Sequence, residues 1–303
     1  MKKIEERDIP QIRELLLKIL GHPNFQTIER LGGLTNHTYH VKMSDGNEYV
    51  VRLPGEGTEE LINRTDEKVS TQLACDLGID AQLLYFGSKG EKLTCYIKGA
   101  ETLCSNSFQD DANLQKAAKI LRMLHTSGVD TKVPFDVFDM AAGYEKIIID
   151  NNVALFDDYK SIKEQVMRIQ NFTEKNTKTK MVPCHNDPLC ENWVLDKNGE
   201  LYLIDWEYAG MNDGMWDLAD VSIEAGFSAD QDDAFLLHYF GRMPKKEEIS
   251  RFHANKLYLD FLWSLWGKAR VPFDGEAMEQ YGKERYIRLK RNINSFLLNN
   301  NID

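Results

Sequence analysis

The sequence is poor in cysteine and has no long apolar run, and each absence excludes a class of protein. Its 303 residues include five cysteines, an odd number with no C-x-x-C pair, which argues against a disulfide framework and against a zinc site. No segment approaches the roughly 18 consecutive apolar residues that a membrane-spanning helix needs. Residues 1–8 carry acidic side chains where a signal peptide would have its apolar region. We therefore expect a cytoplasmic protein without membrane insertion.

An excess of positive charge is also missing. The chain has 37 basic and 48 acidic residues and a net charge of −11, so it would repel nucleic-acid phosphates unless it carried a local basic stripe. We expect no nucleic-acid partner. Hydrophobic residues make up 42% and charged residues 28%, which is typical of a globular protein with a packed core. The length fits one large domain or two small ones.

The spacing of apolar residues indicates a sheet-rich N-terminal part, residues 1–98. One-sided apolar spacing predicts a first helix that begins after Asp8 and ends before Gly21. Strand-like runs come next, with an Asp45-Gly46 turn between the second and the third. A helix is expected after the third strand, at about 59–77. The expected strands are about 25–31, 37–43, 48–53, 81–87 and 91–97.

The remaining residues, 99–303, are expected to be mainly helical. A short strand pair, 193–195 and 201–204, interrupts the helices and is joined by an Asn198-Gly199 turn. The chain is therefore predicted to have an α+β fold with two lobes, 1–98 and 99–303. The expected helices are about 109–127, 143–150, 157–175, 214–225, 230–240, 246–267 and 276–298.

The pattern H-x-D-x4-N, from His185 to Asn192, lies just before the strand pair, and Asp205 lies just after it. Phosphoryl transfer needs one carboxylate that orients the attacking hydroxyl and accepts its proton, and oxygen ligands that hold Mg²⁺ against the phosphates. Asp187 suits the first role. Asn192 and Asp205 suit the second, because the hairpin would return Asp205 to Asn192. The alternative is a set of polar loop residues beside a hairpin.

A glycine-rich turn between the first two strands could bring the backbone close to phosphate. Gly32 and Gly33 permit a close approach, and exposed N–H groups in such a turn bind phosphate. Thr35 and Asn36 complete the turn. Glycine turns between strands are common, so this turn indicates a phosphate site only in combination with other motifs.

A cation and an acid come after the turn, in the order that a nucleotide site needs. Arg52 lies at the end of the third strand, where it could reach the α- and β-phosphates, and Glu67 on the next helix could hold it by a bidentate pair. The alternative is an exposed strand arginine and a solvated helix glutamate. The order of glycine turn, strand cation, helix acid, H-x-D-x4-N and aspartate favours phosphoryl transfer.

In this order and in its lobe plan the chain resembles the protein-kinase-like small-molecule phosphotransferases, which include the choline/ethanolamine kinases and the aminoglycoside phosphotransferases. The resemblance extends from about residue 28 to about residue 292, and its details point to choline/ethanolamine kinases of the compact bacterial form. Arg52 lies where protein kinases use lysine, and Trp206 lies where phenylalanine is usual in this family. The matching segments are 32–36, Asn63-Arg64 with Glu67, 184–187, 204–209, 261–266, and Tyr281 with Arg285.

The resemblance implies a bilobal protein-kinase-like fold, with a small antiparallel-sheet N-lobe that contains one helix and a larger, mainly helical C-lobe. It implies that ATP binds between the lobes and that the enzyme, with Mg²⁺, transfers a phosphoryl group to choline, giving phosphocholine and ADP. Gly32, Gly33, Thr35 and Asn36 would cover the phosphates, and Arg52 would neutralise them. Asp217 would support the loop that carries Asp187.

Two tryptophans predict the nature of the acceptor. Trp263 and Trp266 are three residues apart, so they share one helix face. A quaternary ammonium has no N–H group to donate and is best held by aromatic faces. Together with Tyr281, and with Glu207 or Glu224 for negative potential, the tryptophans would form such a cage. The alternative is an aromatic stripe in the helix core.

Other functions remain open at this stage. The same chemistry could serve ethanolamine, whose –NH₃⁺ needs hydrogen-bond acceptors, or thiamine, or an aminoglycoside. A non-catalytic kinase-like binding module is a further alternative, although the base, the metal ligands and the phosphate cation are all present.

Overall fold

The structure of the protein is a computed structural model that describes residues 4–31, 36–55 and 62–302. Its contacts divide the chain into two compact units. The first unit comprises Met1–Leu124 and Pro188–Ala209, and the second comprises His125–Asp187 and Gly210–Asp303. This division differs from the lobe boundary expected after residue 98, because residues 99–124 and 188–209 also pack in the first unit.

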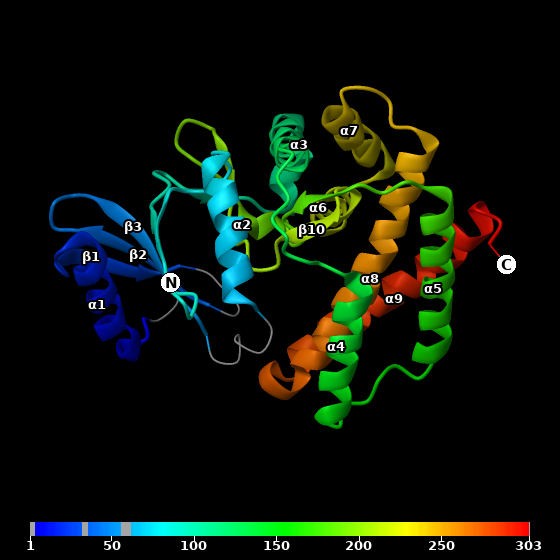
Figure 1. Ribbon diagram of the computed structural model, residues 1–303, viewed down its shortest axis with the longest axis horizontal. Coiled ribbons are helices and arrows are strands. Elements are labelled where there is room, and N and C mark those ends of the chain that lie inside the picture. Colours follow the sequence, from blue (N-terminus) through cyan, green and yellow to red (C-terminus); the bar gives the residue numbers. More distant parts are fainter. Residues whose placement is uncertain (1–3, 32–35, 56–61, 303) are drawn as a thin grey trace. The chain divides into compact units, whose positions relative to one another are not determined.

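The first unit contains an antiparallel five-stranded sheet with the order β1-β2-β3-β5-β4 (Figure 1). All five strands were expected, and each lies within its predicted range. The Asp45-Gly46 turn also forms as predicted: Gly46 has a φ of +87°, and the Asp45 carboxylate accepts the Asn47 N–H at 2.9 Å. The strands are β1 (Phe25–Arg30), β2 (His37–Met43), β3 (Glu48–Leu53), β4 (Leu83–Phe86) and β5 (Lys92–Cys95).

Helix α1 (Ile9–Leu20) packs its apolar stripe against this sheet and ends at Gly21, as predicted. Asp8 occupies the N-cap position, but its side chain makes no capping bond. Instead, the buried Asp8 carboxylate accepts the Tyr39 hydroxyl at 2.6 Å and lies 2.6 Å from Nδ1 of His37. This acid therefore ties the start of the helix to β2. The shared core comprises Ile12, Leu15, Leu16, Tyr39, Val41, Met43, Val51, Leu53 and Leu93.

The alternation of side chains along β3 directs Arg52 away from this core. Val51 and Leu53 belong to the core with α1, so Arg52 between them points to the opposite face of the sheet. The next helix, α2 (Arg64–Asp76), begins later than the expected residue 59. It begins there because the Asn63 side chain caps it, accepting the N–H groups of Thr65 and Asp66 at 3.0 and 3.4 Å. Residues 59–61 lie outside the described part of the chain.

A second, three-stranded sheet with the order β6-β8-β9 explains why residues 188–209 belong to the first unit. Its strands are β6 (Glu101–Thr102), β8 (Trp193–Leu195) and β9 (Leu201–Leu203). β8 and β9 form the predicted hairpin, with Gly199 at a φ of +79° in its turn. The Leu203 N–H donates to the Ile79 carbonyl at 3.1 Å, just after α2. The 3₁₀ helix η4 (Cys190–Asn192) contacts β6, whereas η1 (Glu6–Asp8) contacts α1. The 3₁₀ helix η3 (Ser105–Gln109) and helix α3 (Asp111–His125) follow β6 in the chain.

The second unit is mainly helical, and its long helix α8 packs against α4, α5, α6 and α9 (Figure 1). Helix α4 begins earlier than expected, because Asp136 caps it by accepting the N–H groups of Phe138 and Asp139 at 2.9 Å. The helices are α4 (Val137–Asp150), α5 (Tyr159–Asn176), α6 (Met215–Ala225), α7 (Ala229–Phe240), α8 (Lys246–Asp274) and α9 (Glu276–Asn299). None of the helices in the described ranges is both long and apolar enough to cross a bilayer.

The sequence patterns missed a two-stranded antiparallel sheet in this unit. β7 (Met181–Cys184) pairs with β10 (Gly210–Asp213). Each strand has four residues, too few for a period-two pattern to emerge, and Pro183 in β7 disfavours a strand.

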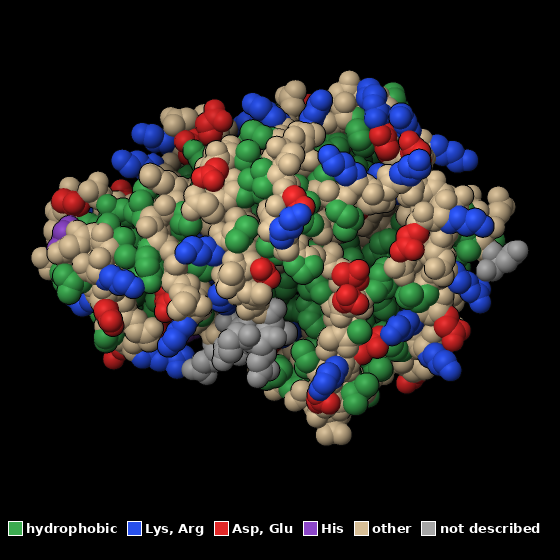
Figure 2. Space-filling model, viewed as in Figure 1, with side chains coloured by type: hydrophobic (Ala, Val, Ile, Leu, Met, Phe, Trp, Pro, Cys, Tyr) green, Lys and Arg blue, Asp and Glu red, His purple; other side chains and the backbone are tan. Residues whose placement is uncertain are grey.

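Acidic and basic side chains are interspersed over the face of the molecule that Figure 2 shows, with no large area of one sign among the residues coloured there.

Helix α8 also continues past its expected end at Gly267, and this glycine lies where α8 and α9 touch. A Cβ atom at Gly267 would lie 2.8 Å from Cα of Gly282, and one at Gly282 would lie 2.8 Å from the Ser264 carbonyl oxygen. The two glycines therefore allow the helix backbones to approach closely. This contact lies within one turn of Trp266 on α8 and next to Tyr281 on α9.

Gly282→Ala is expected to lower the free energy of unfolding by about 1–3 kcal/mol, because the added methyl group overpacks a contact made by backbone atoms. Gly143→Ala is the matched control, since a Cβ atom at this exposed position of α4 meets nothing within 4 Å. The control is expected to gain about 0.5–1 kcal/mol from helix propensity. Urea unfolding of both variants measures the difference, and equal effects would contradict the close-contact interpretation.

Candidate active site

The β8–β9 hairpin brings the two predicted metal ligands together. Trp193 pairs with Leu203 across the hairpin, and the Ile204 N–H donates to the Asn192 carbonyl at 2.9 Å. Asn192 and Asp205 therefore flank this last bond of the hairpin. Asp205 has a φ of +68°, in the left-handed region, and its side chain is 39% exposed. One exposed carboxylate beside one amide is a donor set that suits Mg²⁺, which prefers oxygen ligands and keeps several waters.

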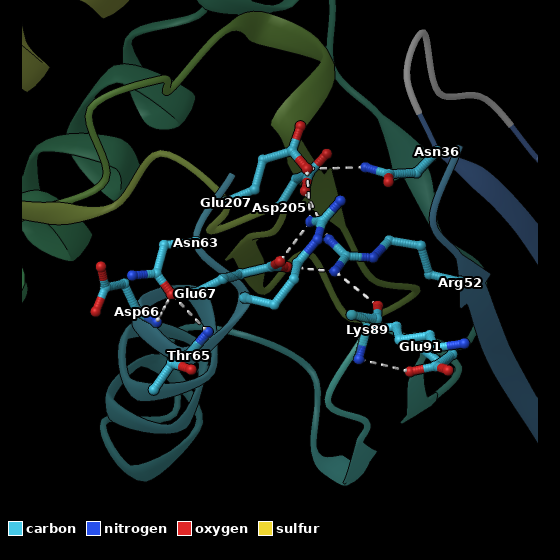
Figure 3. A network of polar contacts seen from close by, with 12 residues as sticks. Asn36, Arg52, Asn63, Thr65, Asp66, Glu67, Lys89, Glu91, Asp205 and Glu207 are labelled. Carbon is cyan, nitrogen blue, oxygen red and sulfur yellow. Dashed lines mark hydrogen bonds and ion pairs between the residues drawn. The ribbon is translucent and has the colours of Figure 1, made fainter. Parts of the chain in front are cut away.

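Arg52 lies beside Asp205 in a largely buried network of charged side chains (Figure 3). Its guanidinium forms an ion pair with Glu67 and donates to Oδ1 of Asp205 at 3.3 Å and to the Gly90 carbonyl at 3.1 Å. Glu67 is nearly inaccessible to solvent, as is Arg52. The predicted pair of strand cation and helix acid is thus present, and it holds the arginine next to a predicted metal ligand.

Glu207 joins the same network, although it was expected, as an alternative to Glu224, to supply negative potential at the ammonium group of the acceptor. Its Oε2 accepts Nδ2 of Asn36 at 2.9 Å and Nη1 of Arg64 at 3.3 Å (Figure 3). Arg64 also donates to Oε2 of Glu67 at 2.6 Å. Within the first unit, Glu207 therefore belongs with the predicted phosphate-binding residues.

This network has one more carboxyl group than guanidinium groups, so its charge favours an additional cation. Its two guanidinium groups, Arg52 and Arg64, face the three carboxyl groups of Glu67, Asp205 and Glu207. Burial raises the pKa of Glu207, and the charge of Asp205 raises it further, against the opposing effect of Arg52. A divalent ion at Asp205 would relieve this repulsion between carboxylates, so the residues present fit Mg²⁺.

Three residues of the predicted glycine turn, Gly32, Gly33 and Thr35, lie outside the described part of the chain. Asn36, the last residue of that turn, is described and is buried. Its bond to Glu207 ties the end of the turn to the segment after β9.

In the second unit, Asp187 ends a loop that is clamped by its backbone. The buried Asp217 carboxylate accepts the N–H groups of His185 and Asn186, both at 2.8 Å. Nε1 of Trp216 donates to the Asn186 carbonyl at 2.9 Å, and Asn186 itself has a φ of +67°. The supporting role implied for Asp217 is confirmed by these bonds. Asp187 is half-buried at the end of the clamped segment.

Behind this loop, His125, Cys184 and Asp217 lie close enough to suggest a metal site. Nε2 of His125 lies 3.0 Å from Asp217, and its Nδ1 lies 2.9 Å from the Tyr239 hydroxyl. Burial raises the pKa of the Cys184 thiol well above its ordinary value, which disfavours the thiolate that binds metal. We interpret the cluster as a hydrogen-bonded brace of the loop.

The predicted acceptor residues Trp263, Trp266 and Tyr281 contact one another in the second unit. The rings of the two tryptophans are perpendicular at 6.1 Å, and Trp266 and Tyr281 form an edge-to-face pair at 5.6 Å. Arg285 lies 4.9 Å from the centre of the Tyr281 ring and donates to Oε1 of Glu224 at 2.5 Å. The cluster thus combines aromatic faces with a carboxylate that already has a cationic partner.

The electrostatic surroundings of Tyr281 connect this cluster with Asp187. Burial raises the pKa of the Tyr281 hydroxyl, and the charges of Glu224, Asp187 and Asp220 add to this effect while that of Arg285 opposes it. The hydroxyl therefore lies within electrostatic range of Asp187. The second unit brings together Asp187, Glu224, Trp263, Trp266 and Tyr281, whereas the first unit brings together Asn36, Arg52, Glu67, Asn192, Asp205 and Glu207.

Two charged residues in these groups were not foreseen from the sequence. Arg64 was noted as part of a motif, but its bonds to Glu67 and Glu207 were not expected. Asp220 is buried one helical turn after Asp217. Its position in the i, i+3 series from Asp217 was a signal that could have identified it.

A cavity of about 710 Å³ also lies in the first unit, near the ends of α2, β5 and the β8–β9 turn. Its lining includes none of the predicted site residues that the structure describes. Its walls include Gln72, Cys75, Asp80, Tyr96 and Lys197.

Comparison with known proteins gives this geometry a family. Residues 27–299 match the choline/ethanolamine kinase family. Choline kinase LicA from Streptococcus pneumoniae has a solved structure that is 33% identical, with a TM-score of 0.83, 96% of this chain covered and 100% of that chain. A structure of LicA in complex with AMP is 32% identical, with a TM-score of 0.80 and coverages of 95% and 98%.

A third relative shows the range of the family. A probable ethanolamine kinase from Arabidopsis thaliana is 28% identical over 311 residues, covering 90% of this chain and 82% of its own length. The names of these relatives differ in the alcohol that is phosphorylated. The family match extends over most of this chain, including every described residue of both groups. The chain belongs to the choline/ethanolamine kinase family, and its fold is the kinase-like fold of that family.

Proposed function

We propose that the protein transfers the γ-phosphoryl group of ATP to the hydroxyl of choline, giving phosphocholine and ADP, with Mg²⁺ as the metal. The observation that carries the choice of acceptor is the contact of Trp263, Trp266 and Tyr281 in the same unit as Asp187. Aromatic faces are the surroundings that a quaternary ammonium prefers. The choline kinase and the AMP complex among the relatives support the acceptor and the nucleotide.

Residues of the first unit hold the nucleotide in this proposal. Arg52 neutralises phosphate charge, and Glu67 keeps its guanidinium in place. Asn192 and Asp205 are the residues that would hold Mg²⁺, which when bound neutralises charge on the phosphates. Asn36 fixes the end of the glycine turn through Glu207.

Residues of the second unit hold the alcohol. The choline hydroxyl oxygen attacks the γ-phosphorus, the bond from that phosphorus to the β–γ bridging oxygen breaks, and ADP leaves. The Asp187 carboxylate orients the hydroxyl and accepts its proton. Because the Asp217 clamp fixes the backbone before Asp187, the carboxylate needs little reorganisation for this step.

Ethanolamine is the second candidate acceptor, favoured by a specific observation. Its –NH₃⁺ needs hydrogen-bond acceptors, and two carboxyl groups, Glu224 and Asp220, lie within electrostatic range of Tyr281. Glu224 already accepts a charged hydrogen bond from Arg285. Because Glu224 is engaged in this way and the rings of Trp263, Trp266 and Tyr281 remain as the partners of the ammonium group, the site favours choline over ethanolamine.

The proposal is tested by ADP release from ATP with Mg²⁺ and, in turn, choline, ethanolamine, thiamine or kanamycin. We expect release with choline that is lost when EDTA removes the metal. Greater kcat/KM for ethanolamine would replace choline as the acceptor and keep the catalytic residues. Release with none of the four, despite ATP binding, would contradict the proposed function.

Trp263→Ala is the variant that isolates the aromatic cage within this assay. The KM for choline is expected to rise about tenfold, while the KM for ATP changes less than about twofold. Trp263→Phe keeps an aromatic face and is expected to recover most of the loss. A parallel rise in both KM values would show that Trp263 serves packing alone.

A further inference from the structure

Asp220 is a buried acid at the centre of one face of α6. It follows Asp217 by three residues and precedes Glu224 by four, so the three acids lie on the same face of the helix. At one end of this face Asp217 clamps the loop before Asp187, and at the other end Glu224 pairs with Arg285. Asp220 lies between these two contacts with a relative exposure of 0%.

Asp220 differs from its neighbours in having no hydrogen-bond partner. Neither of its carboxyl oxygens has one among the residues that the structure describes. Buried polar groups in proteins are nearly always hydrogen-bonded, and an unpaired one is costly to keep. A carboxyl group held in this state points to a ligand that supplies the missing interaction.

Arg285, the cation that acts on Asp220, is engaged by other acids, and so is its neighbour on α9, Arg288. Nη2 of Arg285 donates to Glu224 at 2.5 Å, and its Nη1 lies 3.9 Å from Asp260. Arg288 binds Asp260 through Nε at 2.8 and 3.0 Å and through Nη2 at 2.5 Å. In the described part of the second unit, three neighbouring acids thus share two arginines, which leaves one negative charge without a cation when all are ionised.

We propose that Asp220 is the buried counter-charge for the ammonium group of the acceptor and makes the enzyme select cationic alcohols over neutral ones of the same shape. The proposal rests on the proposed function, that is, on an amino alcohol as acceptor, and it holds for choline and for ethanolamine. The aromatic rings select the shape and the methyl groups of the acceptor, whereas Asp220 selects its charge.

The proposal also predicts that Asp220 loses a proton when a cationic acceptor binds. Burial raises the pKa of Asp220 well above its ordinary value, and the charges of Glu224 and Asp187 raise it further, against Arg285. This direction favours the protonated form of Asp220 in the free protein, whereas a bound cation favours its ionised form. Binding of a cationic acceptor is expected to release a proton, and binding of a neutral one is not. The ionisable groups within electrostatic range of Asp220 are Asp187, Asp217, Glu224, Tyr281 and Arg285.

The test compares choline with 3,3-dimethylbutan-1-ol, in which carbon replaces the charged nitrogen. Asp220→Asn keeps the shape of the side chain and removes its charge. The ratio of kcat/KM for choline to kcat/KM for the neutral alcohol is expected to fall about tenfold in this variant. If ethanolamine is the preferred acceptor, 1-propanol is its neutral counterpart.

Asp232→Asn is the matched control, because Asp232 is another buried acid of the second unit, bonded to Ser222 and to Lys256 on α8. Its loss is expected to lower thermal stability and to leave the ratio unchanged. Calorimetry of the unaltered protein in two buffers of different ionisation enthalpy adds a measurement that does not depend on any variant. It is expected to detect a proton released with choline and none with the neutral alcohol.

An unchanged ratio in an active Asp220→Asn variant would overturn the inference alone, as would equal proton release with the two alcohols. A failure of the proposed function has another signature, which is the absence of ADP release from the unaltered protein with every amino alcohol. That result would overturn both.

Discussion

Asp187→Asn is expected to lower kcat for choline phosphorylation about a thousandfold, because an amide cannot accept the hydroxyl proton and orients the hydroxyl differently. The clamp before this residue consists of backbone N–H groups of His185 and Asn186 on Asp217, so it does not depend on the Asp187 side chain. The KM for ATP and the thermal unfolding midpoint are therefore expected to stay close to those of the unaltered protein. Steady-state ADP release and a thermal scan measure these quantities.

Asp136→Asn is the control for this substitution. Asp136 caps α4 in the same unit, and asparagine caps a helix about as well as aspartate does. Neither turnover nor stability is expected to change in the control. Turnover of Asp187→Asn within tenfold of the unaltered protein would remove Asp187 from the proposed mechanism.

Arg52→Met is expected to lower the free energy of unfolding by about 3 kcal/mol and to abolish most turnover. The substitution leaves the buried Glu67 carboxylate with Arg64 as its remaining described cation and removes the group proposed to neutralise the phosphates. In the double variant Arg52→Met/Glu67→Met, two apolar side chains replace the pair. Stability is expected to recover by most of this loss, since apolar replacement of a buried pair is often neutral, while turnover stays low.

Urea unfolding and ADP release separate the two roles of the Arg52–Glu67 pair. Arg13→Met is the control in the same unit, because Arg13 is exposed and its guanidinium donates to the Pro23 carbonyl at the surface. It is expected to cost less than about 0.5 kcal/mol. Recovery of turnover together with stability in the double variant would contradict a role for Arg52 at the phosphates.

The strands and turns of the first unit were predictable because their signals are local. Period-two runs and the Asp45-Gly46 and Asn198-Gly199 turns act over a few residues, so the patterns identified both hairpins. The hairpin spacing alone brought Asp205 back to Asn192. The pairing of Arg52 with Glu67 followed from the order of the motifs.

Other features were not predictable because they depend on contacts between distant segments. The position of Glu207 is set by Asn36 and Arg64, more than 140 residues before it in the chain. Gly267, where α8 was expected to end, instead lies inside the helix at a close contact with Gly282 of α9, and no local pattern shows such a contact. No local pattern marks Asp220 as unpaired, since that property depends on which acids the arginines of α9 bind.

The interleaving of the two units has a consequence for synthesis of the chain. The chain passes from one unit to the other after Leu124, Asp187 and Ala209. When the ribosome has synthesised the chain as far as Leu124, Arg52 and Glu67 are present but Asn192 and Asp205 are not. At that point β6 also lacks its partner strand β8. Domains commonly fold as units during translation, yet the first unit here stays incomplete until the second unit's α4 and α5 segment has emerged. The nascent chain therefore acquires Asn192 and Asp205, the residues proposed to hold Mg²⁺, only when the β8–β9 hairpin arrives.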